Sequence, residues 1–168
     1  MNPINGILDT LNYKSLFRIY FIFPSGLNKS WFDFITGSIS TNTVLGQIIP
    51  INKNKGILMI YVSDAKAKFL FKLYLKNKSE FNHFVCSYMS KLFNVKVPSP
   101  TNTYFKYWNG ATHIWKPNVD SSVLSDKIIH PFPNEQVYVV GESYAKNFQQ
   151  WMEGALSTVD YMMDKFDI

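Results

Sequence analysis

The residues best suited to chemistry lie near the C-terminus of the sequence. Gly141-Glu142 follows a hydrophobic run at 136–140, and Trp151-Met152-Glu153 opens a helical pattern that extends over 150–166. The first N–H groups of a helix lack an intrahelical acceptor and carry partial positive charge. This spacing therefore predicts a strand, an ordered loop and a helix N-terminus that could face an electron-rich ligand.

Other familiar catalytic patterns are missing from the sequence. His83, His113 and His130 are far apart, and none belongs to a metal-ligand motif such as H-E-x-x-H. His83 falls on the polar face of its predicted helix, where we expect it to be solvated. Ser143 lacks the G-x-S-x-G elbow of serine hydrolases, and Cys86 is a lone thiol without an evident base. The eight glycines form no phosphate-binding loop. Metal, thiol, serine-hydrolase and self-sufficient nucleotide chemistry are therefore disfavoured.

Length and composition predict a globular protein. The 168 residues are 46% apolar and 17% aromatic, enough for one domain or for one domain and part of another. No run of about 18 apolar residues occurs, and the N-terminal residues show no signal-peptide pattern. We therefore expect a cytoplasmic protein with no membrane segment. Abundant Asn and Lys are typical of AT-rich genomes such as those of some large DNA viruses, for which host cytoplasm or a virion is the corresponding location.

The formal charge of +5 is unevenly distributed along the chain. Seven lysines at 53–78 are opposed only by Asp64, and Phe69, Phe71 and Tyr74 are interleaved with them. Lysines can neutralise phosphates while aromatic rings stack on bases, so this segment could bind nucleic acid. A solvated face is the more common outcome, and nucleic acid is therefore a disfavoured partner. The lysines are Lys53, Lys55, Lys66, Lys68, Lys72, Lys76 and Lys78.

Strand patterns dominate the first third of the chain. Residues 17–23 are β-branched and aromatic and end at a Pro-Ser-Gly turn. Residues 44–49, stopped by Pro50, and residues 57–62 flank a polar Asn-Lys loop suited to a hairpin. These segments predict an antiparallel meander.

Helical spacing then begins at Ser79-Glu80, which supply a capping residue and an acidic first turn. Residues 103–108 and 111–115 are predicted strands joined by an Asn-Gly turn, and a loop or short helix follows residue 117. The expected fold class is α+β, with a mixed, largely antiparallel sheet and flanking helices. The helical face predicted to lie on this sheet carries Phe81, Phe84, Val85, Tyr88, Met89 and Leu92.

Two motifs resemble the C-terminal flavin signature of the monoamine and polyamine oxidase family. The family's usual form is a Gly-Glu step followed by an aromatic-x-Glu-Gly-Ala run, and here Gly141-Glu142 and residues 151–156 (WMEGAL) take these places. Residues 107–117 (YWNGATHIWKP) are similar to the segment beside the flavin ring, and residues 15–23 to the central strand of the substrate domain. The resemblance covers nearly the whole chain.

The resemblance implies FAD binding and oxidation of an amine by hydride transfer to the flavin. It places Gly141 and Glu142 near the pyrophosphate and ribityl chain of FAD. It also places Trp151 and Met152 at the pyrimidine edge of the flavin, and Trp108 beside the ring. A helix N-terminus at that edge would stabilise the negative charge that develops on the reduced flavin.

Three residues take positions that the family gives to catalysis. Trp151 takes one of two aromatic positions on the reacting face, and Thr112 takes the other. Arg18 takes the strand position that usually carries a lysine near the flavin, and an arginine cannot readily act as a neutral base. Ala111 takes the place of the flavin-linking cysteine of monoamine oxidases, which implies that FAD is bound non-covalently.

The resemblance also divides the chain, into a substrate-domain-like region at 1–130 and the strand, loop and helix of an FAD-binding part at 131–168. The family's glycine-rich dinucleotide loop is not in this sequence. One hypothesis is a flavin amine oxidase-like protein for small amines, completed by an FAD-binding partner chain or a homo-oligomer. The other is a non-catalytic binding or structural protein that retains the fold. In both, residues 137–140 are expected to expose an apolar edge that seeks a partner.

A labelled single-stranded DNA oligonucleotide tests the lysine segment directly. We expect no saturable binding at near-physiological salt in a fluorescence anisotropy titration. Binding through the lysines would instead weaken steeply as salt rises, because each neutralised phosphate releases a counterion. Saturable binding with that salt dependence would contradict the expectation.

Overall fold

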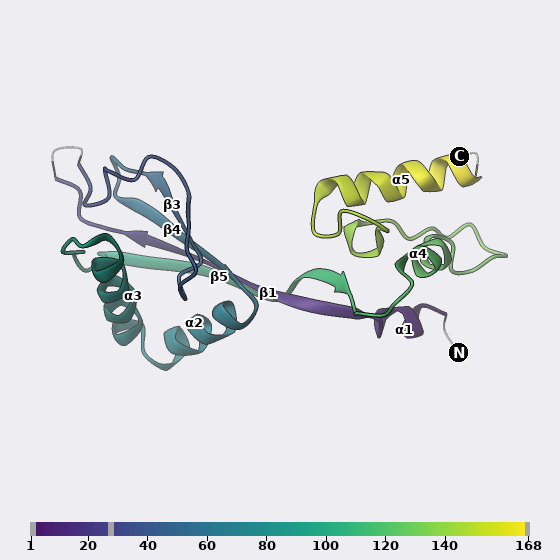
Figure 1. Cartoon of the computed structure of the whole chain (residues 1–168), viewed down its shortest axis with the longest axis horizontal. Helices are drawn as coiled ribbons and strands as arrows, with labels where there is room; N and C mark the ends of the chain where they lie inside the picture. The colour runs from purple at the N-terminus through teal and green to yellow at the C-terminus, as the bar shows by residue number, and fades with distance from the viewer. Residues whose placement is uncertain (1–2, 27–28, 167–168) are drawn as a thin grey trace. The chain divides into compact units, whose positions relative to one another are not determined.

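The computed structural model describes residues 3–26 and 29–166, which form two units (Figure 1). Unit 2 is Ser15–Asn109, and unit 1 combines the residues up to Lys14 with those from Gly110 onward. β1 and β5 contribute residues to both units. The elements are α1 (Pro3–Leu8), β1 (Leu11–Ile22), β2 (Ile39–Ser40), β3 (Gln47–Asn52), β4 (Ile57–Ser63), α2 (Asp64–Lys76), α3 (Lys78–Phe93), β5 (Asn102–Trp115), α4 (Ser121–Ile129), the 3-10 helix η1 (Glu142–Tyr144) and α5 (Met152–Phe166).

Unit 2 is built on an antiparallel sheet with the strand order β2-β3-β4-β1-β5. β1 pairs with β4 so that Arg18 lies opposite Tyr61 and Ile22 lies opposite Ile57. β3 and β4 form the predicted hairpin. With α2 and α3 on one side of it, the sheet confirms the predicted α+β fold.

The core of unit 2 lies between that side of the sheet and the two helices. Phe17, Ile19 and Phe21 alternate along β1 and are fully buried, whereas Arg18 and Tyr20 point to the other face. Full burial of a large apolar side chain stabilises a fold by about 1.5–3 kcal/mol. The alternation along β1 therefore decides which face becomes core. Residues of the other elements that join this core include Leu58, Ile60, Leu70, Phe81, Val85 and Met89.

Two strand predictions need correction. Pro50 was expected to end the strand, but β3 includes it. A register shift after Pro50 accommodates the missing N–H donor. β5 continues through Asn109-Gly110, where a hairpin turn was expected. An Asn-Gly step permits a turn but does not impose one, and here the residues on both sides of it continue as one strand.

Two helix predictions also need correction. α2 was not expected, because the lysines at 66–76 concealed the helical spacing of its buried residues, Ala67 and Leu70. α3 begins two residues earlier than predicted, and its N-cap is Asn77 in place of Ser79. The Asn77 side chain accepts hydrogen bonds from the N–H groups of Ser79 and Glu80 at 2.8 and 3.1 Å.

Unit 1 contains α4 and α5, which confirm the short helix after residue 117 and the helix near the C-terminus. The predicted strand at 136–140 is wrong. A β-strand requires a neighbouring strand with which it forms a ladder of backbone hydrogen bonds. Within the described residues, segment 136–140 forms only one backbone–backbone hydrogen bond, from the N–H of Val139 to Ile129 O at 3.0 Å.

The two units do not coincide with the division predicted from the resemblance. The expected boundary between residues 130 and 131 falls inside unit 1. This boundary follows from the resemblance to a flavin enzyme, and it stays a prediction. Among the described residues, no helix is long and apolar enough to cross a membrane.

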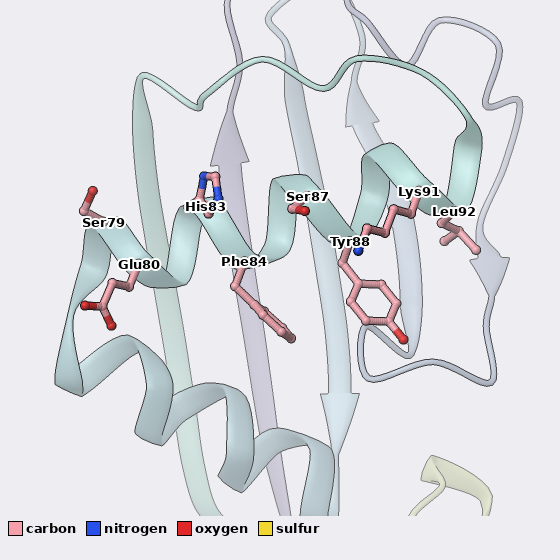
Figure 2. Close-up of a pocket in the computed structure, with 8 residues that line it drawn as sticks. All are labelled: Ser79, Glu80, His83, Phe84, Ser87, Tyr88, Lys91 and Leu92. Carbon is pink, nitrogen blue, oxygen red and sulfur yellow. The ribbon is translucent and has the colours of Figure 1, made fainter.

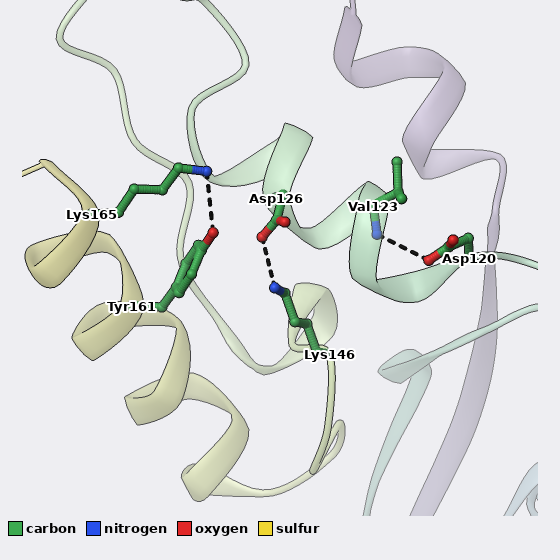
Figure 3. A network of polar contacts seen from close by, with 6 residues as sticks. All are labelled: Asp120, Val123, Asp126, Lys146, Tyr161 and Lys165. Atoms are coloured by element: carbon green, nitrogen blue, oxygen red, sulfur yellow. Dashed lines mark hydrogen bonds and ion pairs between the residues drawn. The ribbon is translucent and has the colours of Figure 1, made fainter.

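An ion pair joins α4 to the loop before α5 (Figure 3). Lys146 Nζ lies 2.9 Å from Asp126 Oδ1, an oxygen that is shielded from solvent. Partial burial favours the neutral acid, but contacts with Lys146 and Tyr161 outweigh it, so the pKa of Asp126 is lower than its ordinary value. Asp126 in turn raises the pKa of Lys146.

Asp126→Asn should destabilise the protein slightly at neutral pH. The two side chains are 37% and 35% exposed, so solvent screens the pair and the expected loss is below about 1 kcal/mol. Because the folded pKa of Asp126 is depressed, its contribution is complete above the unfolded pKa of about 3.9 and disappears as pH falls through the lower folded value. Urea unfolding should show a difference between variant and wild type that shrinks in acid.

The control is Asp164→Asn, which removes an exposed carboxylate that makes no ion pair within the described ranges. This variant should match the wild type at both pH values. A deficit of Asp126→Asn that persists unchanged in acid would show that the ion pair is not its cause.

Candidate functional site

The loop between residues 141 and 151 is closed by one carboxylate. Oε1 of Glu142 accepts a hydrogen bond from Ser143 Oγ at 3.0 Å, and Oε2 accepts a short one from the backbone N–H of Gln150. Charge-assisted hydrogen bonds of this kind are among the stronger ones in proteins. Glu142 therefore acts as an organiser of the loop, since both of its oxygens already have partners within it.

A second layer of hydrogen bonds ties this loop to the end of β5. The backbone N–H of Trp115 donates to Gln149 Oε1 at 3.0 Å, and the Trp115 indole donates to Ala145 O at 3.0 Å. Gln149 Nε2 donates to Ser143 O at 2.7 Å. The loop has defined positions for its backbone before any ligand binds, which reduces the ordering cost of binding.

Gly154 allows α5 to lie directly against the loop. A Cβ atom at this position would come within 2.4 Å of the Phe148 carbonyl oxygen and 3.2 Å of the Ala145 side chain. At the other end of the loop, the N–H of Gly141 donates to Thr158 Oγ1 of α5 at 2.9 Å. Packing thus requires the glycine of the Glu-Gly-Ala motif, because only a residue without a side chain permits this approach.

The start of α5 offers groups that the protein itself does not use. The side chains of Trp151 and Met152 are 68% and 80% exposed. The backbone N–H groups of Met152 and Glu153 have no acceptor within the described chain. Free N–H donors at the positive end of a helix dipole, beside an exposed indole, form a suitable surface for a flat electron-rich ring.

The outward side of α5 is also apolar. Met152, Leu156 and Met163 fall on one side of the helix and are 80%, 63% and 46% exposed. Val137 and Val140, in the segment before the loop, are exposed as well. A helix of a folded domain normally turns such a stripe inward, so this stripe marks a surface that another part of a protein would cover.

Ser143 and His113 are brought together, although their sequence positions gave no sign of it. Ser143 Oγ lies 2.9 Å from His113 Nδ1 and 3.0 Å from a carboxylate oxygen of Glu142. When the single hydroxyl proton is donated to Glu142, His113 must donate to Ser143. A nucleophilic serine requires a histidine that accepts its proton, so this arrangement does not support hydrolase chemistry.

Arg18 and Trp108, both in unit 2, are close neighbours on the sheet face opposite the core. The guanidinium carbon of Arg18 lies 5.2 Å from the centre of the Tyr61 ring and 5.8 Å from that of Trp108. Lys106 Nζ lies 5.9 Å from the Trp108 ring. The face thus carries two cations held by aromatic rings through cation–π attraction.

The predicted site residues are therefore divided between the two units. Thr112, half-buried on β5, shares unit 1 with Gly141, Glu142, Trp151 and Met152, and its hydroxyl forms no hydrogen bond within the described residues. Arg18 and Trp108 belong to unit 2. Sequence reasoning missed Tyr61 and Lys106 as members of the Arg18 face, because only the pairing of β1 with its neighbours reveals them.

A hollow of about 950 Å³ runs along one side of α3 in unit 2. Figure 2 shows Phe84 and Tyr88 pointing into it, and the rings of Phe84 and Phe69 are 6.0 Å apart. Its charged or polar groups Glu80 and His83 are exposed, as expected for His83. An open hollow without a buried acid or base is better suited to contact than to catalysis. The residues that line it are Ser79, Glu80, His83, Phe84, Ser87, Tyr88, Lys91 and Leu92.

Thiol and metal chemistry receive no support from the described residues. Burial raises the pKa of the Cys86 thiol to about 11, so the thiol is neutral near pH 7 and behaves as an apolar core group. No three His, Cys, Asp or Glu side chains of the described ranges are grouped so that they could hold a metal ion.

Comparison with known proteins gives no family: no protein-family model matches the sequence, and no curated protein matches it. The amine oxidase resemblance therefore rests on its motifs alone.

Gly154→Ala should loosen the loop. The added methyl group must displace the Phe148 carbonyl, and overpacking of this kind costs about 1–3 kcal/mol, more than the gain of up to about 1 kcal/mol from better helix propensity. Urea unfolding should show lower stability, and NMR should show altered amide signals for residues 142–151.

Gly6→Ala is the matched control, because Gly6 is also helical and in unit 1 but a Cβ there meets no atom within 4 Å. It should leave the protein as stable as the wild type or slightly more stable. Equal effects of the two substitutions would mean that the close approach at Gly154 is not what positions the loop.

Proposed function

We propose that this protein is a flavin amine oxidase-like module that contributes the C-terminal loop and helix of an FAD site. The observation that carries the proposal is the start of α5, where the free N–H groups of Met152 and Glu153 lie beside the exposed indole of Trp151. The sequence resemblance assigns this same position to the pyrimidine edge of the flavin. The free donors and the exposed ring at this position support the proposal.

The groups present at the start of α5 suit a bound flavin, because unpaired N–H donors and an exposed aromatic ring lie side by side there. Bound FAD would supply the hydride acceptor for oxidation of an amine to an imine. The N–H groups at the helix start would donate to the carbonyl and nitrogen edge of the ring and stabilise negative charge on it. Trp151 would form one wall of the substrate position, and the loop held by Glu142 would approach the pyrophosphate and ribityl chain.

The rest of the FAD site must come from outside these 168 residues. They contain no glycine-rich dinucleotide loop, so the adenosine half of FAD has no cradle here. The apolar stripe of Met152, Leu156 and Met163 is the surface that such a dinucleotide-binding region would cover. We propose that this region is a partner chain or a further part of a longer chain, and that FAD is held non-covalently because Ala111 offers no thiol.

A second candidate is a non-catalytic binding protein that retains this fold. Arg18 favours it, because the permanently charged guanidinium stands where the family usually has a lysine and cannot accept a proton. Thr112, in place of the second aromatic residue, points the same way. For either function we propose a cytoplasmic setting, which is host cytoplasm or a virion if the gene is viral.

Riboflavin titration of the isotopically labelled chain tests the flavin proposal. We expect weak binding, without retention of FAD through gel filtration, and signal changes centred on the Met152 and Glu153 amides and the Trp151 indole. Adenosine diphosphate, which lacks the flavin ring, should not produce these changes. If riboflavin leaves the start of α5 unaffected, the proposed flavin contact is wrong.

Trp151→Ala and Trp115→Ala form a matched pair of substitutions. Trp151 is exposed, so its removal should change stability by no more than about 0.5 kcal/mol but abolish the riboflavin response. Trp115 anchors the loop at Ala145, so its removal should lower stability as well as the response. A Trp151→Ala protein that unfolds like Trp115→Ala would indicate a structural role for Trp151.

A further inference from the structure

Arg18 is the single arginine of the protein: the other 16 of its 17 basic residues, Lys and Arg counted together, are lysines. Position 18 is therefore the one place where the sequence presents a guanidinium. The two side chains differ in chemistry, because a guanidinium presents five donors in a planar fork that matches a carboxylate, whereas an ammonium is a compact point charge.

The sheet holds this guanidinium in a defined place. Arg18 lies opposite Tyr61 in the β1–β4 register, and the rings of Tyr61 and Trp108 lie 5.2 and 5.8 Å from the guanidinium carbon. Aromatic contacts of this kind restrict the side chain while they leave its N–H groups free to donate. The fork is therefore oriented before any ligand arrives.

Within residues 3–26 and 29–166, no carboxylate pairs with this charge. Arg18 makes no ion pair among the described residues, and Lys106 adds a second cation to the same face. The neighbouring positions of this face on β1, β3 and β4 carry apolar, aromatic, amide or hydroxyl side chains, as the strand register shows. They are Leu16 and Tyr20 of β1, Gln47 and Ile49 of β3, and Met59, Tyr61 and Ser63 of β4.

We propose that the Arg18 face binds the carboxylate group of a small ligand whose apolar or aromatic body lies over Tyr20, Tyr61 and Trp108. A carboxylate can accept two parallel hydrogen bonds from the guanidinium fork, and the rings provide apolar contact for the rest of the molecule. Lys106 adds attraction for the anion. A ligand with only an ammonium group is repelled by the two cations.

The same chemistry discriminates among amines: an amine that carries a carboxylate, such as an amino acid, satisfies the Arg18 face, whereas a simple monoamine or polyamine does not. The carboxylate site itself depends only on residues of unit 2.

The single arginine makes the test direct, because it gives one Nε–H signal in an NMR spectrum. We expect phenylacetate to shift the Arg18 Nε–H and the Trp108 indole N–H with saturation. Phenethylamine, which has the same aromatic body and a cation in place of the anion, should leave both signals unchanged. Inorganic phosphate tests for an unselective anion site and should bind more weakly than phenylacetate.

Three substitutions complete the test, and all are at exposed positions, so the folded spectrum should be retained. Arg18→Gln should abolish phenylacetate binding. Arg18→Lys, which keeps the charge but loses the fork, should weaken it about tenfold, a change of about 1.4 kcal/mol. Lys106→Gln should weaken it less than Arg18→Lys does.

The carboxylate proposal is overturned if phenylacetate does not bind, if it binds Arg18→Gln as well as wild type, or if phenethylamine or phosphate binds as tightly. These outcomes are distinct from failure of the flavin proposal, which is read at Trp151 and Met152. If phenylacetate binds at Arg18 while riboflavin leaves α5 unaffected, the carboxylate site stands and only the flavin proposal fails.

Discussion

The alternation of side chains along β1 is the constraint on which the rest of unit 2 depends. Phe17, Ile19 and Phe21 are fully buried beneath the helices, and a strand that turns these residues inward must turn Arg18 and Tyr20 outward. A slip of one residue would place the guanidinium in the core and expose three large apolar side chains. The position of the only arginine is therefore set by the same hydrophobic burial that holds the sheet together.

In unit 1, hydrogen bonds and close packing hold the loop between residues 141 and 151 in place, while the start of α5 stays accessible. Glu142 and Gln149 form hydrogen bonds with other groups of the loop, and Gly154 allows α5 to approach the Phe148 carbonyl. The Trp151 side chain is 68% exposed, so the indole is available for a ligand. Such separation of positioning residues from contacting residues is typical of preorganised sites.

Regular patterns were predicted well, and the errors have physical causes. The β-branched and aromatic run of β1 and the helical spacing of α3 and α5 could be recognised because these signals are local in the sequence. The Asn109-Gly110 step and the segment 136–140 were predicted wrongly, because a turn or a strand depends on which partners the chain finds elsewhere. α2 was missed because its exposed lysines outnumber its buried residues.

The sequence by itself determined the α+β class, the Gly-Glu and Glu-Gly-Ala motifs, and the presence of one arginine among many lysines. These are properties of local pattern and composition, and no tertiary contact is needed to see them. Only the tertiary structure decided that Tyr61 and Trp108 flank Arg18 and that His113 meets Ser143. It also decided that the outer stripe of α5 remains uncovered. Contacts between residues far apart in the chain follow from strand register and packing, which a single sequence does not specify residue by residue.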